Sequence, residues 1–461
     1  MNQETRIKKI AEITKREKEH GRQDIPWKDS LEPMAVFLIP LEYLVYNKYN
    51  GRILSRTKSL EMQGYKIDAA SKEGKNLIEK LLMDSNPSRN KQTLESINKM
   101  GQEKVGIITR DGIIIDGNRR AMLLNKLDKY DYFKTVVLDV TLEENPLEIE
   151  KLETTYQMGE DEKLGYKAIE KYLKSKLLYQ RKISVEKIAD WMGEDISKVK
   201  EYLSVMDVMD EYLDYLGCKG IYTQLDERED QFISLTRWLE AFYGENSSKA
   251  FDGYTDSDVD DLKIISFDYI RAIYEGKEFR NIGYGLRDNH FFGDKRIWAS
   301  FRDFHFKKID SIKNAERKID FKSDNLEAHL RDRDAKYFES TKNKEGESFL
   351  EENIRIHKQQ LQNKKSANEP SKLVNTASDA LNAINQKNPS FSSSDVSVGL
   401  ELISEKVVSM ITVNSPDKIL SQVVKILKSI TLGKNSSLKK HMLVKVLEIE
   451  KIVASIKKDI Q

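Results

Sequence analysis

The segment from Thr109 to Leu124, TRDGIIIDGNRRAMLL in one-letter code, constrains the fold of this chain more than any other. Asp111-Gly112 separates two apolar runs, which predicts two strands joined by a tight turn because glycine adopts the positive φ that such turns need. A second pair, Asp116-Gly117, follows the second strand and precedes a helix-forming run. We therefore expect a strand–turn–strand–helix unit whose helix runs from about Asn118 to Leu127.

Two adjacent arginines, Arg119 and Arg120, fall in the first turn of that helix. The backbone N–H groups of a first turn have no partner within the helix, and the helix dipole disfavours a cation there by roughly 0.3–1 kcal/mol. Two arginines in this place suggest an anionic ligand, because a helix N-terminus and guanidinium groups together hold phosphates well. The alternative is that Asp116 caps the helix while the arginines pair with neighbouring carboxylates, and the spacing does not decide between the two.

This segment resembles the signature of the ParB/sulfiredoxin-like fold, in which a Gly-x-Arg-Arg-x-x-Ala-like box cradles the phosphates of a nucleotide. Residues 39–52 resemble the opening strand and Asn-rich turn of that domain, and residues 93–101 resemble the helix that leads into its hairpin. The resemblance covers roughly residues 35–140 and includes a long insertion at about 54–89. The nucleotide-binding residues that it implies are Asn50, Arg52, Gly117, Asn118, Arg119, Arg120 and Gln157.

The composition bounds the partners and the compartment. The chain has 461 residues, enough for two or three domains with cores of their own. Its 77 Lys and Arg balance 76 Asp and Glu, so any affinity for nucleic acid must come from local patches rather than net charge. A single cysteine excludes an internal disulfide, and no signal peptide or apolar run of membrane-spanning length is present. We expect a cytoplasmic protein without a membrane partner.

The chain is expected to be α+β, with its β structure confined to the N-terminal part. No proline occurs between Pro146 and Pro370, and Leu, Ile and Tyr recur there at helical spacing. The predicted divisions are a charged N-terminal arm over 1–30, a ParB/sulfiredoxin-like α/β domain over 31–145, a helical domain over 146–345, a linker over 346–400 and a C-terminal helical association module over 401–461.

Residues 183–206 have the form of a helix-turn-helix, with Ser184 as the first N-cap and Gly193 in the turn. ParB-family proteins place such a unit after the nucleotide-binding domain. Residues 184–217, however, contain nine Asp and Glu against three Lys, a charge that repels phosphates. A helical hairpin within a bundle is therefore the alternative. The side chains expected to contact DNA, if this unit binds it, are Ser197, Lys198, Lys200 and Glu201.

Residues 153–160 stand where the family has a motif that opens the helical domain and helps to hold metal and nucleotide. Thr154 and Thr155 replace the Glu-Asn pair of the family, so the sequence leaves the metal ligands unknown. The resemblance implies a homodimer whose binding to DNA is gated by CTP or ATP with Mg²⁺. One alternative is a ParB-fold nuclease or NTP hydrolase of a mobile-element or phage-defence system, with Asp116 or Glu160 as its catalytic carboxylate. Another is a non-catalytic interaction module.

Two further segments remain ambiguous. Residues 279–298 interleave cations with aromatic side chains, as single-strand binding surfaces do, but we expect them to form a loop packed over the helical core. Apolar stripes over 419–430 and 438–456 predict a helical hairpin, which cannot bury both stripes alone and should self-associate or dock on a partner protein. Residues 416–461 carry ten Lys against four Asp and Glu, which form either a solvated face or a DNA contact.

Overall fold

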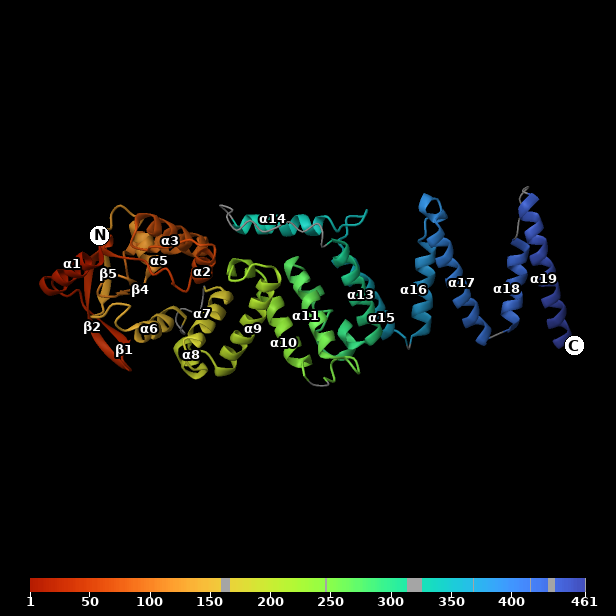
Figure 1. Cartoon of the computed structure of the whole chain (residues 1–461), viewed down its shortest axis with the longest axis horizontal. Helices are drawn as coiled ribbons and strands as arrows, with labels where there is room; N and C mark the ends of the chain where they lie inside the picture. The colour runs from red at the N-terminus through yellow and green to blue at the C-terminus, as the bar shows by residue number, and fades with distance from the viewer. Residues whose placement is uncertain are drawn as a thin grey trace. The chain divides into compact units, whose positions relative to one another are not determined.

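The computed structural model describes residues 1–158, 166–244, 247–312, 326–367, 369–414, 416–429 and 436–460. The chain divides into two units, residues 1–368 and 369–461 (Figure 1). The first unit begins with a mixed sheet and its covering helices and continues as packed helices, and the second is helical in the part described. The expectation of an α+β chain with its sheet at the N-terminal end is therefore confirmed.

One five-stranded sheet organises the N-terminal part, with the strand order β1-β2-β5-β3-β4. Its strands are β1 Arg22–Trp27, β2 Ser30–Pro40, β3 Gly106–Ile108, β4 Ile114–Asp116 and β5 Tyr132–Val137. Strands β3 and β5 run parallel, and the other neighbouring pairs are antiparallel. Five helices accompany the sheet: α1 Gln3–Arg16, α2 Leu54–Met62, α3 Lys72–Ser85, α4 Pro87–Met100 and α5 Asn118–Asn125.

The predicted strand–turn–strand–helix unit is present as β3, β4 and α5, and α5 ends two residues before the expected boundary. Gly112 in the turn has a φ of 85° and Gly117 before the helix has a φ of 101°. A Cβ atom on Gly117 would lie 2.7 Å from Cζ of Phe133 on the neighbouring strand. Glycine is therefore required at the start of α5 both by the left-handed backbone and by the close approach of β5.

The N-terminal residues are more firmly attached than the expected charged arm over 1–30. Ile10 on α1 is buried among the apolar side chains under the sheet, and Nε of Arg6 donates a hydrogen bond to the Asp111 carbonyl at 2.9 Å. Ile25 and Trp27 alternate into a second apolar cluster, so β1 becomes the edge strand of the sheet. The segment contains short apolar patterns among its charged residues, and these apolar side chains are buried only when the whole sheet is formed.

The remaining helices of the first unit pack in chain order. In Figure 1, α7, α9, α10, α11, α13 and α15 follow one another, each against the next. The helices after the sheet are α6 Pro146–Met158, α7 Ala168–Gln180, α8 Val185–Met192, α9 Ile196–Tyr215, α10 Glu229–Phe242, α11 Asp256–Arg271, α12 Gly276–Phe279, α13 Lys295–Ile312, α14 Leu326–Glu339 and α15 Phe349–Lys365.

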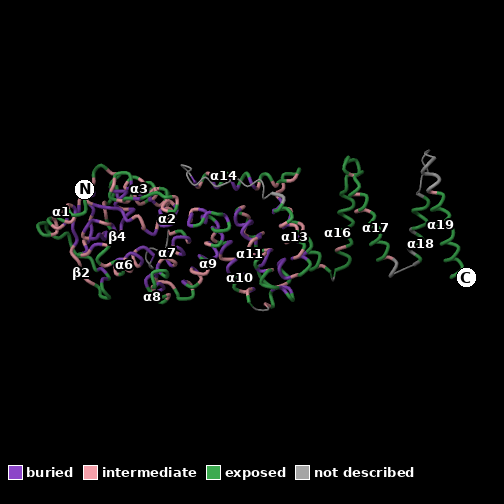
Figure 2. Tube along the Cα trace, in the orientation of Figure 1, coloured by how far each residue is buried: buried purple, intermediate pink, exposed green. Residues whose placement is uncertain are grey.

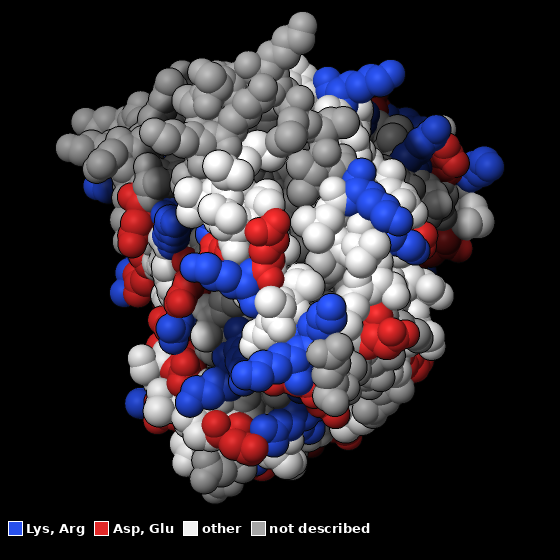
Figure 3. All heavy atoms as spheres, turned by 90° about the vertical axis from the view of Figure 1, so that its right-hand side faces the viewer, with Lys and Arg blue, Asp and Glu red and all other residues white. Residues whose placement is uncertain are grey.

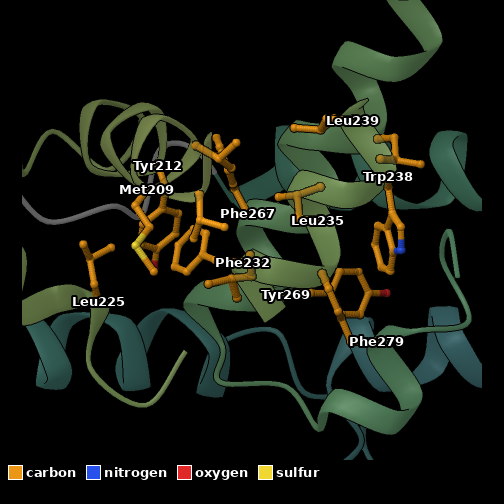
Figure 4. Close-up of a cluster of buried hydrophobic side chains, with 14 of the residues drawn as sticks. Met209, Tyr212, Leu225, Phe232, Leu235, Trp238, Leu239, Phe267, Tyr269 and Phe279 are labelled. Atoms are coloured by element: carbon orange, nitrogen blue, oxygen red, sulfur yellow. The ribbon is translucent and has the colours of Figure 1, made fainter. Parts of the chain in front are cut away.

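Aromatic side chains dominate the core of these helices. Figure 4 shows Tyr212, Phe232 and Phe267 converging from α9, α10 and α11, and the rings of Trp238 and Phe279 stack with centroids 4.9 Å apart. Four of the five aromatic residues of the 279–298 segment, Phe279, Phe291, Phe292 and Trp298, are fully buried, whereas Tyr284 is 54% exposed. The segment is therefore mainly part of the core, as expected, and four of its five aromatic rings are not available to stack on bases.

The predicted linker over 346–400 is wrong in its first part. Phe349, Leu350 and Ile354 of α15 are buried in the helical core, because α15 packs along α13. The second unit begins after this helix and contains α16 Pro370–Asn382, α17 Ser394–Asn414, α18 Pro416–Ser429 and α19 Ser436–Ile460. Residues 370–382 are thus helical too, although all their side chains are exposed or half-exposed.

The expected C-terminal pair of helices is present as α18 and α19. In the second unit the described side chains are mostly exposed, in contrast to the buried interior of the first unit (Figure 2). The exposed large apolar residues include Leu402, Val407, Val423, Val424, Leu443, Val446 and Val453. Most of the described side chains of these apolar stripes are therefore exposed. Among the residues described, no helix combines the length and apolar character needed to span a bilayer.

Candidate functional site

The start of α5 opens into a small pocket of about 190 Å³, which we call the cationic pocket. Its walls come from α4, the loop between α4 and β3, the end of β4, α5, the loop before α2, and α6. Tyr166, two residues before α7, completes the wall. The described lining residues are Asn50, Arg52, Arg89, Thr93, Lys104, Asp116, Gly117, Asn118, Arg119, Arg120, Tyr156, Gln157 and Tyr166. Every nucleotide-binding residue implied by the sequence resemblance lines this one space.

The charge of the cationic pocket is strongly one-sided. Among its described lining residues, five are Lys or Arg and one is a carboxylate, Asp116. The Arg52 guanidinium lies 4.2 Å from the centre of the Tyr166 ring, a cation–π contact that fixes one side of the space. Arg119 is largely buried at the helix start. This concentration of cations contrasts with the near-zero net charge of the whole chain.

The helix terminus adds backbone dipoles to these cations. Gly117 is the N-cap of α5, and no side chain caps the helix. The first-turn N–H groups of a helix lack intrahelical acceptors and carry the positive end of the helix dipole. The sequence alternative in which Asp116 caps the helix is therefore wrong, because the left-handed conformation of Gly117 places that carboxylate outside the capping position.

Arg120 and Asp116 nevertheless form an ion pair, as the second half of that alternative expected. Nη1 of Arg120 also donates to the carbonyls of Lys104, at 2.9 Å, and Val105, at 3.3 Å. These three contacts hold the guanidinium beside the start of β3. A planar group fixed in this way can present its remaining N–H edge to an anion without losing further side-chain entropy.

Two of the predicted pocket residues build the frame of the site. The Asn118 Oδ1 accepts a hydrogen bond from the Asn47 N–H at 2.9 Å, and its Nδ2 donates to the Ile114 carbonyl at 3.1 Å. The Asn50 Oδ1 accepts from the N–H of Arg52 at 3.1 Å. Both asparagines are buried. They shape the loop that carries Arg52 and leave ligand contact mainly to the cations.

Gln157 connects three parts of the structure behind the pocket. Its Oε1 accepts from the Gly51 N–H at 2.7 Å, while its Nε2 donates to the Ile115 carbonyl at 3.0 Å and to Oε1 of Glu153 at 3.1 Å. Gln157 therefore ties α6 to the loop before α2 and to β4. Gln157 thus lies in the pocket wall, and its hydrogen bonds give it a positioning role.

Glu153 is a buried carboxylate that the sequence interpretation passed over in favour of Thr154 and Thr155. Burial raises its pKa to about 6, although the nearby Lys174 ammonium, 3.7 Å away, lowers it. The Asn47 amide also donates to its Oε1 at 3.0 Å. The signal available in the sequence was its spacing, since Glu153 stands one helical turn before Gln157 and so shares its face.

The catalytic assignments gain less from the structure than the binding assignments. Asp116 is engaged with Arg120, and Glu160 lies outside the described residues. Burial and the charge of Asp116 raise the pKa of Tyr156 to about 12, so this phenol stays protonated at neutral pH. Among the residues described, no three His, Cys, Asp or Glu side chains gather as a metal site.

The helix-turn-helix segment forms as α8 and α9, with Gly193 in the left-handed conformation between them. Of the side chains expected to contact DNA, Ser197 and Lys200 are exposed. Lys198 pairs with Glu201 at 2.5 Å, and Glu201 also receives Arg237 of α10 at 2.6 Å. These pairs neutralise the start of α9. Helix α9 extends to Tyr215 and packs on α7 and α10, which is the arrangement of a bundle helix.

A comparison of the sequence with protein-family models and with curated proteins gave no match. The five positive residues of the cationic pocket come from four separate stretches of the chain: Arg52, Arg89, Lys104, and the adjacent Arg119 and Arg120. The sequence resemblance identified Arg52, Arg119 and Arg120. It missed Arg89, Lys104, Tyr156 and Tyr166, because no local pattern indicates which residues of α4, α6 and the loops meet in space.

Proposed function

We propose that this protein is a ParB-like nucleotide-binding protein, with the cationic pocket as the site for the phosphates of a nucleoside triphosphate. The observation that carries the proposal is the meeting of five cationic side chains with the uncapped start of α5. Charged hydrogen bonds from guanidinium groups and from first-turn N–H groups are the means by which proteins hold phosphate. The order of strand, hairpin, arginine box and helix-turn-helix supports the same assignment.

Binding is better supported than hydrolysis. A volume of about 190 Å³ accommodates phosphate groups but is small for a whole organic ligand, which typically occupies about 300–1,000 Å³. The carboxylate on the described wall is held by Arg120 rather than poised beside an open space. We therefore favour a binding switch over the nuclease and NTP hydrolase alternatives, which no feature of the described residues supports separately.

A switch requires a route from the pocket to the rest of the chain, and α6 provides one. This helix carries Tyr156 and Gln157 in the pocket wall and packs against both β4 and α8. A phosphate bound at the start of α5 would act on the contacts of Gln157 and so shift the position of α6. We propose that nucleotide binding gates the association of this chain with DNA, and with a second copy of itself, through this helix.

The electrostatics favour the second unit as the DNA contact. Figure 3 shows Lys and Arg side chains on the described surface, with Asp and Glu side chains among them. Residues 184–217 carry a net charge of about −6, whereas residues 416–461 carry ten Lys against four Asp and Glu. Lys425, Lys428 and Lys445 of α18 and α19 are exposed. The lysine-rich helices therefore meet phosphates at lower electrostatic cost than α9.

The test is calorimetric titration of CTP, ATP, GTP and UTP, each with and without Mg²⁺, into the full chain and into Arg119→Ala/Arg120→Ala. The matched control is Arg331→Ala/Arg355→Ala, which removes the same charge from exposed positions outside the pocket. We expect at least one nucleotide to bind to wild type and to the control but not to the pocket variant. Equal heats from wild type and a folded pocket variant, or no heat from any nucleotide, would refute the proposal.

A further inference from the structure

A second and larger cleft adjoins the cationic pocket. It has a volume of about 720 Å³, and we call it the β1–α8 cleft after the elements at its two ends. It lies between the edge strand of the sheet, the loop around Glu103, α6 and the end of α8. Its lining residues are Gln23, Ile25, Pro26, Glu103, Lys104, Val105, Ile107, Asp116, Arg120, Thr155, Tyr156, Asp190, Trp191 and Gly193.

The two spaces share a wall. Lys104, Asp116, Arg120 and Tyr156 line both the cationic pocket and the β1–α8 cleft. The ion pair between Arg120 and Asp116 stands at this boundary, and a hydrogen bond from Arg120 to the Lys104 carbonyl holds it just before the start of β3. A ligand held by Arg120 from the cationic side is therefore next to the entrance of the larger cleft, and one molecule can occupy both.

The β1–α8 cleft has a different chemistry from the cationic pocket. Ile25, Ile107 and Trp191 are buried apolar side chains that form its floor, with Tyr156 half-buried beside them. Its exposed polar residues include Glu103 and Asp190, which are acceptors. An aromatic and apolar floor with carboxylates at its edge suits a flat organic group that carries N–H or O–H donors. It does not suit further phosphates.

We propose that the β1–α8 cleft holds the base and sugar of the nucleotide whose phosphates occupy the cationic pocket. This inference rests on the proposed phosphate site and names the rest of its ligand. The phosphate end of the ligand faces five cations, and its donor-bearing end faces Glu103 and Asp190. A nucleoside phosphate has this same polarity, with anionic charge at one end and amino and hydroxyl donors at the other.

The position of the cleft gives the nucleoside a further role. Asp190 and Trp191 belong to the last turn of α8, and Gly193 is the left-handed residue that joins α8 to α9. A base lying against Trp191 thus contacts the turn between these two helices. The phosphates anchor the ligand, and the nucleoside is the part that acts on the helix pair. An inorganic triphosphate would bind without reaching α8.

The experiment compares inorganic triphosphate with CTP, ATP, GTP and UTP in calorimetric titrations of the full chain. Gln23→Phe places a bulky ring at an exposed cleft-lining position, and Asp24→Phe places the same ring on the neighbouring residue, which does not line the cleft. We expect the best nucleotide to bind at least tenfold more tightly than triphosphate. Gln23→Phe should remove that advantage while leaving triphosphate binding unchanged, and Asp24→Phe should preserve both.

Tryptophan fluorescence provides the second measurement, because the chain contains four tryptophans and Trp191 is the one in the cleft wall. The nucleotide should change the emission of wild type, and Trp191→Phe should abolish most of that change, whereas Trp298→Phe in the helical core should not. Triphosphate should leave the emission unaltered.

The outcomes separate the two proposals. Binding of neither triphosphate nor nucleotides would overturn the phosphate site itself. Binding of triphosphate and nucleotides with equal affinity, insensitive to Gln23→Phe and without a Trp191 signal, would preserve the phosphate site and overturn the nucleoside cleft. A nucleotide preference that survives in Gln23→Phe would also place the base elsewhere.

Discussion

Replacing Arg120 by alanine should weaken phosphate binding more than replacing the adjacent Arg119. Both side chains line the cationic pocket, and Arg120 is paired with the pocket carboxylate Asp116. Arg119→Ala removes one positive charge. Arg120→Ala removes one positive charge and also exposes the negative charge of Asp116 to the ligand. The two substitutions therefore differ in the charge that the phosphate meets, although their chemistry is the same.

The size of this difference follows from simple electrostatics. A hydrogen bond to a charged group contributes about 1.5–3 kcal/mol, which either substitution loses. An uncovered carboxylate about 6 Å from a phosphate charge adds roughly 1–3 kcal/mol of repulsion for an effective dielectric between about 20 and 80. Asp116 and Arg120 are 20% and 17% exposed, so solvent screens this repulsion only in part, and a value of about 1.5 kcal/mol applies. Arg120→Ala should then cost about 3–4 kcal/mol, or two to three orders of magnitude in Kd.

The assay is a double-mutant cycle measured by calorimetry with inorganic triphosphate. The variants are Arg120→Ala, Asp116→Asn and the combination, with Arg119→Ala as the comparison. Removing the carboxylate charge in the Arg120→Ala background should recover about 1–2 kcal/mol, so the double variant should bind about tenfold more tightly than Arg120→Ala alone. Thermal unfolding of each variant establishes that the protein remains folded.

The reasoning fails if the double variant binds no better than Arg120→Ala while both are folded. Asp116 would then lie outside the electrostatic field of the ligand, and the anion would not occupy the cationic pocket. It fails as well if Arg119→Ala and Arg120→Ala weaken binding equally, since the ion pair between Arg120 and Asp116 is the reason for the expected difference.

Three other properties of the chain can be tested separately. Gly117→Ala should lower the free energy of unfolding by about 1–3 kcal/mol in denaturant titration, because φ at this position is 101° and the new Cβ would lie 2.7 Å from Phe133. Unchanged stability would contradict the described turn. Burial raises the pKa of Glu170 from 4.5 to about 7. Between these pH values the folded state retains a proton that the unfolded state has lost, so the free energy of unfolding falls as the pH rises through that window. Glu170→Gln should remove about 3 kcal/mol of this fall, and an identical pH profile would refute the shift. Val446 on α19 is 48% exposed, so Val446→Glu should convert a self-associated chain into a monomer in light scattering. A wild-type chain that is already monomeric would contradict association through this face.

The parts of the fold that follow from local rules could be predicted from the sequence. Two Asp-Gly pairs around three isoleucines specified a hairpin and a helix start, since the backbone conformations that glycine permits are local properties. The helix ends at Ser184, Gly193 and Pro416 follow from capping preferences in the same way. The strand near the N-terminus escaped prediction because Ile25 and Trp27 become apolar signals only when β2 lies beside them.

The candidate site divides along the same line. Residues within one motif, Gly117 to Arg120, were accessible from the sequence, and the resemblance added Arg52 and Gln157. Arg89 and Lys104 enter the pocket only because α4 leads into β3 beside α5, a tertiary arrangement that no local pattern encodes. Trp191 illustrates the limit most clearly. It was assigned to a helix-turn-helix, and its contribution to a cleft beside the sheet depends on how α8 packs against α6.

The distribution of charge leads to a last prediction about DNA. The first unit concentrates cations in a pocket too small for a duplex, and its helix pair is acidic. Residues 416–461 have an excess of six positive charges, with Lys425, Lys445 and Lys451 exposed. Counterion release makes the salt dependence of binding proportional to the number of phosphates contacted. A chain ending at residue 367 should therefore lose most of its DNA affinity and of its salt slope, whereas Lys198→Ala/Lys200→Ala in the full chain should change both only slightly. A fluorescence anisotropy titration over a range of salt concentrations measures the DNA affinity and its salt slope. Full affinity in the shortened chain would assign the DNA contact to α9 instead.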